Sequence, residues 1–414
     1  MNNRRRFLSI AAAVLLPAFS FAQAPPAAAP VSASGAQGRG GGRGRGGAAV
    51  VSPETAADGR VTFRFRAPDA TAVSVTGIGT AALLMTKDAQ GVWSATTADA
   101  LKPDIYSYAF IVDGARVPDP ANLGSGWITY HDSTLLVPGV PWTNNSSDLP
   151  HGAVAKHIYK SAIIGGPETY YVYTPPAYDV KRAKPYPVLV LLHGLGATPQ
   201  AAQEWIGQGG ANLILDSLIA EGKAEPMILV TPGANGNIQG TRGAAAGFPN
   251  FTKALIEEIL PQVEKEYNAS DKASDHAISG LSAGAAQSPL LLNRLDQFQW
   301  IGSFSPGFDM YNPAWGTSGM GPTVNGQRAL LPAGTYESTF PNLDSKANSQ
   351  IKLLYVACGT ADDHLALTRQ FKAFLDERKV RVTYVEGLND THSYSFWRPQ
   401  LTAFAAMIFK PRAK

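Results

Sequence analysis

The sequence predicts a three-layer α/β domain preceded by a small all-β, immunoglobulin-like sandwich. The first observation behind this prediction is periodicity, because short runs of alternating apolar and polar residues give way to wholly apolar runs separated by helical stretches. The second is size, because 414 residues are too many for one average domain. The third is composition, since 45% apolar and 16% charged residues are typical of a globular protein.

The chain begins with "MNNRRRFLSIAAAVLLPAFSFAQA", in which arginines precede an apolar stretch and small residues follow it. This pattern predicts a signal peptide over residues 1–22, and therefore an exported protein, periplasmic or extracellular. The "NRRRFLS" segment also resembles a twin-arginine signal, so both export routes stay open. The sequence has no later apolar stretch long enough to span a membrane, so no stable membrane insertion is expected after cleavage.

Residues 23–48 are rich in Gly, Arg, Pro and Ala and contain almost no large apolar side chain, which predicts a disordered linker. Residues 1–48 hold six of the 35 basic residues and no acidic one, which leaves 29 basic against 32 acidic residues in the remainder. This slightly acidic remainder argues against a nucleic-acid partner. The single cysteine, Cys358, excludes an intrachain disulfide and is expected to be a small buried hydrophobe.

The segment from residue 49 to residue 145 is predicted to form the sandwich. Val61 and Phe63 alternate with polar residues, as in a half-buried strand. Further short strands are expected in "TAVSVTG", "GVWSATT" and "DIYSYAFIVDGARVPDP", where Asp113-Gly114 is typical of a hairpin turn. These features favour an antiparallel sandwich. Its aromatic side chains could stack on sugar rings or pack in a structural lid, the candidates being Trp93, Tyr106, Tyr108, Trp127 and Tyr130.

Residues 150–414 are predicted to form the α/β domain. Strands of a parallel sheet that are buried on both faces are apolar throughout, and such runs occur at residues 170–176, 186–194, 226–233, 275–282, 299–307 and 351–360. Helical patterns lie between them at residues 212–222, 251–267 and 367–379. This alternation predicts one three-layer domain. The Gly-rich segment 310–336 is expected to be either an insertion that shapes a cleft or a surface loop.

Ser282 is the candidate nucleophile, because it lies in a G-x-S-x-G pattern between the strand "HAISG" and a helix that starts with small residues. A serine hydroxyl needs a neighbouring base and a group that orients this base. The α/β-hydrolase fold places the serine on a sharp strand-to-helix turn, where Gly280 and Gly284 would allow close approach. The sequence context therefore predicts the α/β-hydrolase turn.

The triad partners are expected downstream of the serine. Of the two histidines there, His392 lies in a loop before the last helix and is the candidate base, whereas His364 is too close to Asp362 along the chain to face both the acid and the nucleophile. Asp362 follows a buried strand and is the candidate acid. Asp363 is the alternative, and a helix N-cap is the structural alternative for Asp362.

The oxyanion hole needs two backbone N–H groups. One is expected from Ala283, which follows the nucleophile, and the other from Leu195 in "LLHGLG", where His193 is expected to brace the turn. Trp205, Gln287 and Trp397 are candidates for substrate binding, and both tryptophans could equally be core residues. The sequence contains no cluster with metal-ligand spacing, so no metal and no cofactor is expected.

The motifs "LLHGLGATPQAAQEW", "ISGLSAGAAQS", "CGTADD" and "THSYSFWRPQL" resemble those of carbohydrate esterase family 1, the feruloyl and acetylxylan esterases related to esterase D. The resemblance covers residues from about 155 to 410 and implies a triad of Ser282, Asp362 and His392. Relatives often carry Gly-Gly before the histidine, where this chain has Asp390-Thr391. The upstream sandwich resembles a family-48 carbohydrate-binding module, an arrangement similar to that of enterochelin esterases.

The resemblance implies a secreted serine esterase that acts on plant cell-wall polysaccharide esters, with ferulate or acetate as the acyl group. Siderophore hydrolysis of the enterochelin type and general short-chain ester cleavage are the alternatives within this class. A glycan-binding protein with a degenerate hydrolase domain and an acyltransferase with a sugar acceptor are alternatives of other classes. The expected partner is an esterified polysaccharide or a small ester, and the oligomeric state is left open.

Overall fold

The computed structural model describes most of the chain, namely residues 50–122, 132–144, 148–195, 199–233, 244–315 and 320–410. The predicted signal peptide at residues 1–22 and the predicted linker at residues 23–48 lie outside the described residues. So do two of the aromatic candidates for sugar stacking, Trp127 and Tyr130.

Two antiparallel sheets form the first folded part. One sheet has the strand order β1 (Glu54–Thr55), β2 (Val61–Arg66), β6 (Val92–Thr96) and β5 (Thr86–Lys87). The other sheet has the order β4 (Leu83–Leu84), β3 (Val73–Thr76), β7 (Asp104–Val112) and β8 (Ala115–Val117), and β9 (Ser133–Val137) also pairs with β7. Trp93 and Tyr108 are buried in the core between the sheets. They therefore offer no ring face to a sugar, which corrects two of the stacking candidates.

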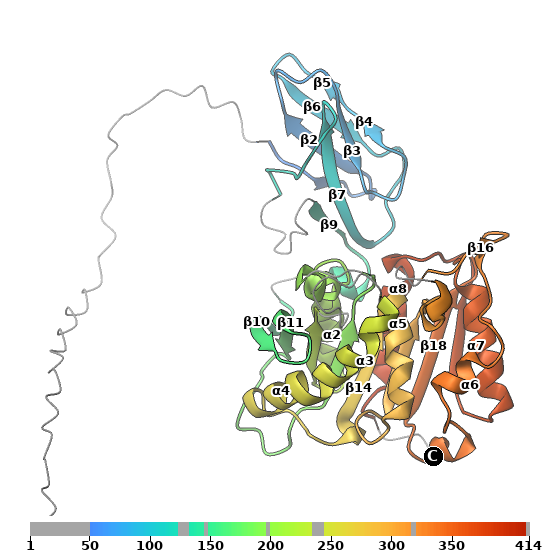
Figure 1. The fold of residues 1–414 in the computed structure, drawn as a ribbon. Coiled ribbons are helices and arrows are strands. Elements are labelled where there is room, and N and C mark those ends of the chain that lie inside the picture. Colours follow the sequence, from blue (N-terminus) through green and yellow to red (C-terminus); the bar gives the residue numbers. More distant parts are fainter. Residues whose placement is uncertain are drawn as a thin grey trace, which may run out of the picture. The chain divides into compact units, whose positions relative to one another are not determined.

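An eight-stranded sheet forms the centre of the α/β part (Figure 1). Its strand order is β10 (Ala153–Ser161), β11 (Gly166–Thr174), β13 (Ile228–Pro232), β12 (Val188–Leu192), β14 (His276–Gly280), β15 (Trp300–Phe304), β18 (Leu353–Gly359) and β19 (Thr383–Gly387). Neighbouring strands from β13 to β19 are parallel, as predicted. The expectation of a parallel strand near residues 170–176 is wrong, because β11 pairs antiparallel with both β10 and β13. A short connection joins β10 to β11, and such a connection permits only antiparallel pairing.

Helices cover both faces of this sheet (Figure 1). The described helices are α1 (Glu204–Gly207), α2 (Ala211–Ala220), α3 (Ala244–Ala254), α4 (Leu260–Glu266), α5 (Ser282–Gln287), α6 (Thr335–Thr339), α7 (Leu365–Glu377) and α8 (Tyr394–Met407). Successive residues of β12 belong to different cores: Val190 is part of the core that includes residues of α3 and α7, and Leu189 and Leu191 are part of the core that includes residues of α2 and α8. A strand in this position is apolar on both faces, which explains the unbroken apolar run. None of the helices in the described ranges is long and apolar enough to cross a membrane.

The predicted helix at 251–267 is not one continuous α-helix. A π-helical turn at Leu255–Ile259 separates α3 from α4, and Pro261 follows at the start of α4. Proline has no N–H to donate to the carbonyl four residues earlier, and its ring clashes with that carbonyl. A wider turn just before the proline relieves this conflict.

A buried ion pair joins β7 to α8. The Arg398 guanidinium donates to Asp104 Oδ1 at 2.6 Å and also to the backbone oxygens of Ile105 and Gln208. Arg398 is almost fully buried. A buried charge is tolerated only when it is paired and hydrogen-bonded, so loss of either Arg398 or Asp104 should destabilise the fold.

Candidate active site

Ser282 lies on a sharp turn between β14 and α5. Its φ is +52°, in the left-handed region that a residue with a Cβ rarely adopts. Both flanking glycines are needed, because a Cβ on Gly280 would lie 2.7 Å from the carbonyl carbon of Gly284, and a Cβ on Gly284 would lie 2.4 Å from His193 O. The G-x-S-x-G pattern therefore reflects backbone contacts that leave no room for a side chain at either glycine.

His392 and Asp362 form a hydrogen-bonded pair. Asp362 is fully buried and follows β18, and His392 lies in the loop between β19 and α8. His392 Nδ1 is 3.0 Å from Asp362 Oδ2 and 3.2 Å from Oδ1. Burial alone would raise the pKa of Asp362, but hydrogen bonds from His364 and His392 outweigh it and hold the pKa well below its usual value. Asp362 is therefore a carboxylate at neutral pH, as a group that orients an imidazole must be.

Backbone contacts fix the loop of His392 against the loop of Asp362. Ala361 N donates to Asp390 O at 2.9 Å, and Thr360 N donates to Gly387 O at 2.8 Å. A Cβ on Gly359 would lie 2.2 Å from Asp390 O, so glycine is required where the two loops cross. Asp390 stands where relatives often carry glycine, and its backbone carbonyl serves as the anchor of this loop.

Trp397 supports the imidazole of His392. The two rings lie 4.9 Å apart in an edge-on arrangement, and Trp397 Nε1 donates to Ser305 Oγ at 3.0 Å. Ser305 also hydrogen-bonds to the carboxylate of Asp362. The side chain of Trp397 is mostly buried. Its predicted role in substrate binding stays a prediction, whereas the structure shows it packed behind the histidine.

The turn at residues 305–307 links Ser282 to the Asp362–His392 pair. Ser282 O accepts a hydrogen bond from Gly307 N at 3.0 Å, and Ser305 contacts both Asp362 and Trp397. In the described part of the chain, no hydrogen bond joins the Ser282 hydroxyl to His392. Catalytic hydrogen bonds are often long without substrate and shorten when it binds.

The candidate oxyanion donor Leu195 lies on the loop after β12, Ala283 lies in the first turn of α5, and a backbone hydrogen bond joins these two segments. Gly284 N donates to His193 O at 3.0 Å, and a Cβ on Gly194 would lie 3.6 Å from Ser282 Cβ. The backbone amides of Leu195 and Ala283 have no acceptor among the described residues, whereas Gly194 N donates to Glu204 Oε2. Two unpaired amides beside a serine are what an oxyanion hole requires.

Trp205 and Gln287 are both buried. Trp205 is fully enclosed, donates from Nε1 to Leu192 O at 2.8 Å and contacts Phe304 and Tyr394 edge-on, so it presents no surface to a ligand. Gln287 lies at the end of α5, and neither its Oε1 nor its Nε2 has a partner among the described residues. Buried amides normally have partners. Gln287 is as enclosed as Trp205, so its role in substrate binding stays a prediction.

His364 belongs to this site, although the sequence analysis set it aside. Its Nδ1 lies 3.2 Å from Asp362 Oδ1 and 2.8 Å from Asp363 Oδ1, and its ring stacks on that of His392 at 4.7 Å. It faces the acid because Asp362 folds back over its own loop and also accepts a hydrogen bond from His364 N at 3.0 Å. The sequence signal that could have found it is the histidine two residues after the acid.

Four side chains at the site have the composition of a metal-binding group. One potential ligand atom from each of Asp362, Asp363, His364 and His392 lies within a sphere of 4.8 Å. The sequence spacing had suggested no such cluster, because His392 joins it only through the fold. The imidazoles and carboxylates of this group contact one another directly.

Comparison with known proteins places these features in context. Residues 161–408 match the sequence profile of the family described as Esterase. An endo-1,4-beta-xylanase/feruloyl esterase of Xylanibacter ruminicola is 29% identical over 372 residues, which cover 86% of this chain and 46% of that protein. The chain thus spans about half the length of this curated relative.

Two solved structures share the fold. A ferulic acid esterase of Anaeromyces mucronatus, in complex with ferulic acid, is 21% identical and has a TM-score of 0.53, covering 66% of this chain and 96% of that chain. The enterobactin esterase of Shigella flexneri is 19% identical and has a TM-score of 0.58, covering 84% of this chain and 92% of that chain. These matches confirm the predicted fold class.

Proposed function

The chain belongs to the esterase family, and from this premise we propose that it is an exported serine carboxylic-ester hydrolase of plant cell-wall polysaccharide esters. The observation that carries the proposal is the left-handed turn that presents Ser282 at the start of α5. The backbone of Ser282 is hydrogen-bonded to Gly307, and Ser305 in the same turn contacts Asp362, the partner of His392. The proposed acyl group is ferulate, with acetate as the alternative.

In the proposed mechanism, Ser282 Oγ attacks the ester carbonyl while His392 Nε2 takes the hydroxyl proton. Asp362 keeps the His392 Nδ1 proton in place and stabilises the imidazolium that forms. The amides of Leu195 and Ala283 would hold the developing oxyanion. His392 then gives its proton to the leaving alkoxide, and a water molecule, deprotonated by His392, cleaves the acyl-enzyme to the free acid and Ser282.

The preference for a feruloyl ester is supported by the relatives. One relative that aligns with most of this chain is named a xylanase/feruloyl esterase, and one solved structure of the same fold contains ferulic acid. A contact between Gln287 and the substrate remains part of the proposal and requires that its enclosed, unpartnered amide become accessible. We also propose that the first folded part is a carbohydrate-binding module similar to those of family 48. Binding of the S282A variant to insoluble xylan would test this proposal.

Siderophore hydrolysis is the second candidate. The enterobactin esterase covers more of this chain than the ferulic acid esterase does, including part of the region before the eight-stranded sheet. A glycan-binding protein with a degenerate hydrolase domain is less well supported, because the hydrogen-bonded Asp362–His392 pair and the strained serine turn would have no use there.

The test is hydrolysis of methyl ferulate, acetylated xylo-oligosaccharide and enterobactin by the wild type and by two serine variants. S282A should lower kcat by about 10⁶-fold with folding intact. S279A is the matched control, because Ser279 lies three residues earlier in β14 and its buried hydroxyl has no partner among the described residues. Full activity in S282A would refute the assignment of Ser282 as the nucleophile. Efficient hydrolysis of enterobactin alone would favour siderophore hydrolysis.

Export is proposed from the sequence of residues 1–22. The N-terminal sequence of the protein recovered from the periplasm or the medium should begin after Ala22. A protein retained in the cytoplasm with Met1 intact would contradict this part of the proposal.

A further inference from the structure

We propose that His364 is a positioning residue that carries a positive charge beside the Asp362–His392 pair and thereby sets the acidic limit of the pH range in which the enzyme works. The inference rests on the proposed function, because it assumes that His392 acts as the base. It concerns a residue that neither touches the nucleophile nor belongs to the triad.

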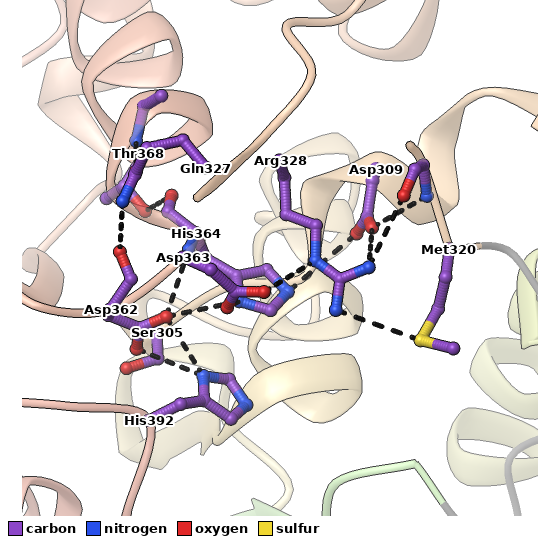
Figure 2. A network of polar contacts seen from close by, with 12 residues as sticks. Ser305, Asp309, Met320, Gln327, Arg328, Asp362, Asp363, His364, Thr368 and His392 are labelled. Carbon is purple, nitrogen blue, oxygen red and sulfur yellow. Dashed lines mark hydrogen bonds and ion pairs between the residues drawn. The ribbon is translucent and has the colours of Figure 1, made fainter. Parts of the chain in front are cut away.

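Two carboxylates contact the His364 ring directly. Figure 2 shows the Asp362 carboxylate beside both imidazoles, approached by His364 Nδ1 and by His392 Nδ1. Asp363 Oδ1 lies 2.8 Å from the same His364 nitrogen. The ring is almost fully buried and lies nearly parallel to that of His392, with an angle of 23° between the planes. A change in the charge of His364 therefore acts on His392 through space and through the shared acid.

The segment 310–336 brings the next charge. Arg328, in the hairpin of β16 (Thr323–Val324) and β17 (Gln327–Arg328), donates from Nε to Asp363 Oδ2 at 2.9 Å, and its backbone N donates to Asp363 O at 2.7 Å. Gln327 Nε2 donates to Asp362 O at 3.0 Å. The hairpin thus hydrogen-bonds to the loop that carries Asp362 and Asp363. The sequence alone does not indicate this role for the segment.

Asp309 completes the charged group. It is fully buried, with Oδ2 at 3.8 Å from Arg328 Nη1 and Oδ1 at 4.0 Å from His364 Nε2. Figure 2 shows the row formed by Asp309, Arg328, Asp363 and His364 extending from the Asp362–His392 pair. Three carboxylates therefore surround one imidazole: Asp309 comes from the turn after β15, and Asp362 and Asp363 come from the loop between β18 and α7.

Charge balance explains what such an arrangement does. Burial lowers the pKa of His364, but hydrogen bonds to Asp362 and Asp363 outweigh it and raise the pKa to about 9. The buried thiol of Cys358 nearby has a raised pKa and is uncharged. With His364 and Arg328 both positive, three carboxylates leave one net negative charge, which matches the one proton that His392 gains during attack. Without the charge on His364, two net negative charges would favour protonation of His392 before catalysis.

The test is the dependence of kcat/KM on pH for an ester cleaved by the wild type, compared in H364Q and D363N. H364Q removes one positive charge and should move the acidic limb to higher pH by about one unit. D363N removes one negative charge and should move it to lower pH. H157Q is the matched control, because His157 also stacks on a ring, that of Tyr170, but lies outside this group; its acidic limb should not move.

A role limited to packing would lower kcat in H364Q and leave both limbs in place, which would overturn the inference. So would shifts of the same sign in H364Q and D363N. Titration of the ring nitrogens in ¹⁵N-histidine-labelled protein reads the charges without turnover. It should show His364 losing its proton near pH 9, whereas a neutral His364 at pH 7 would overturn the inference. If the wild type cleaves no ester, the proposed function fails, and the titration still decides the charge on which the inference depends.

Discussion

Raising the pH should destabilise the wild type more than H364Q. A histidine normally has a pKa near 6.5, and that of His364 is raised to about 9 in the folded protein by Asp362 and Asp363. The folded state therefore holds the proton more tightly than the unfolded state does. The stabilisation is fully present below about pH 6.5 and is lost as the pH rises through about 9.

The size of the effect follows from the shift. A difference of about 2.5 units at about 1.4 kcal/mol per unit gives about 3 kcal/mol of unfolding free energy. Because the low pKa of Asp362 reflects the same contact, it is not added to this figure. His364 is buried, so solvent screens the contact little. The glutamine side chain in H364Q cannot bind the proton, so this contribution to the pH dependence disappears in the variant.

Equilibrium urea unfolding between about pH 6 and about pH 9.5 measures the effect. Tyrosines and lysines elsewhere titrate in both proteins, so their contribution cancels in the difference between wild type and H364Q. This difference should fall by about 3 kcal/mol across the range. A difference that stays constant within about 0.5 kcal/mol would show that His364 is not charged in the folded protein and would refute the reasoning.

Three further substitutions test other contacts. Q287M should leave the unfolding free energy unchanged or higher, because it removes two unpaired polar atoms. If Gln287 contacts the substrate, the variant should also raise KM by about 3- to 10-fold. An unchanged KM would show that Gln287 does not contact the substrate. G284A should abolish activity and destabilise by about 1–3 kcal/mol, because its Cβ would overlap His193 O, whereas G166A, with open space around it, should behave as wild type. R398M should cost about 3–5 kcal/mol, because it removes the charge partner of Asp104 and leaves only the hydrogen bond from Trp142. A second substitution, D104N, should recover part of this cost, and no recovery would contradict ion pairing as the cause.

Much of the α/β part could be predicted because its signals are local. A strand covered on both faces must be apolar throughout, and the structure confirms strands within each of the six apolar runs. Strand direction is not local: β11 is antiparallel because β10 precedes it, and β10 was missed because its exposed and half-buried residues give it no apolar run. The π-turn before Pro261 was missed because the helical period continues through it.

The site shows the same division between local and distant signals. The strained turn at Ser282 follows from two glycines within five residues, so the sequence could indicate it. The contact between Asp362 and His392 spans 30 positions and depends on where β18 and β19 end, which the order of the motifs made predictable. The hairpin that carries Arg328 has a local signal, because Asn325-Gly326 is typical of a tight hairpin turn and both residues have a positive φ. The contact of Arg328 with Asp363 has no such signal, because it joins residues 35 positions apart.

His364 was set aside because residues two apart usually point in different directions along a regular element. Asp362 is not in a regular element: its carboxylate accepts the backbone N–H of His364 at 3.0 Å, a local turn that aspartate side chains favour. The same turn aims the His364 ring at the carboxylate and places it on the face of His392. The structural alternative for Asp362, a helix N-cap, is wrong, because His364 is the N-cap residue of α7 and no side chain caps this helix. The Asp362 carboxylate instead bonds to the turn before the helix and to His392. A short spacing between an acid and a histidine in a loop can thus indicate a second charge at a triad rather than a rejected base.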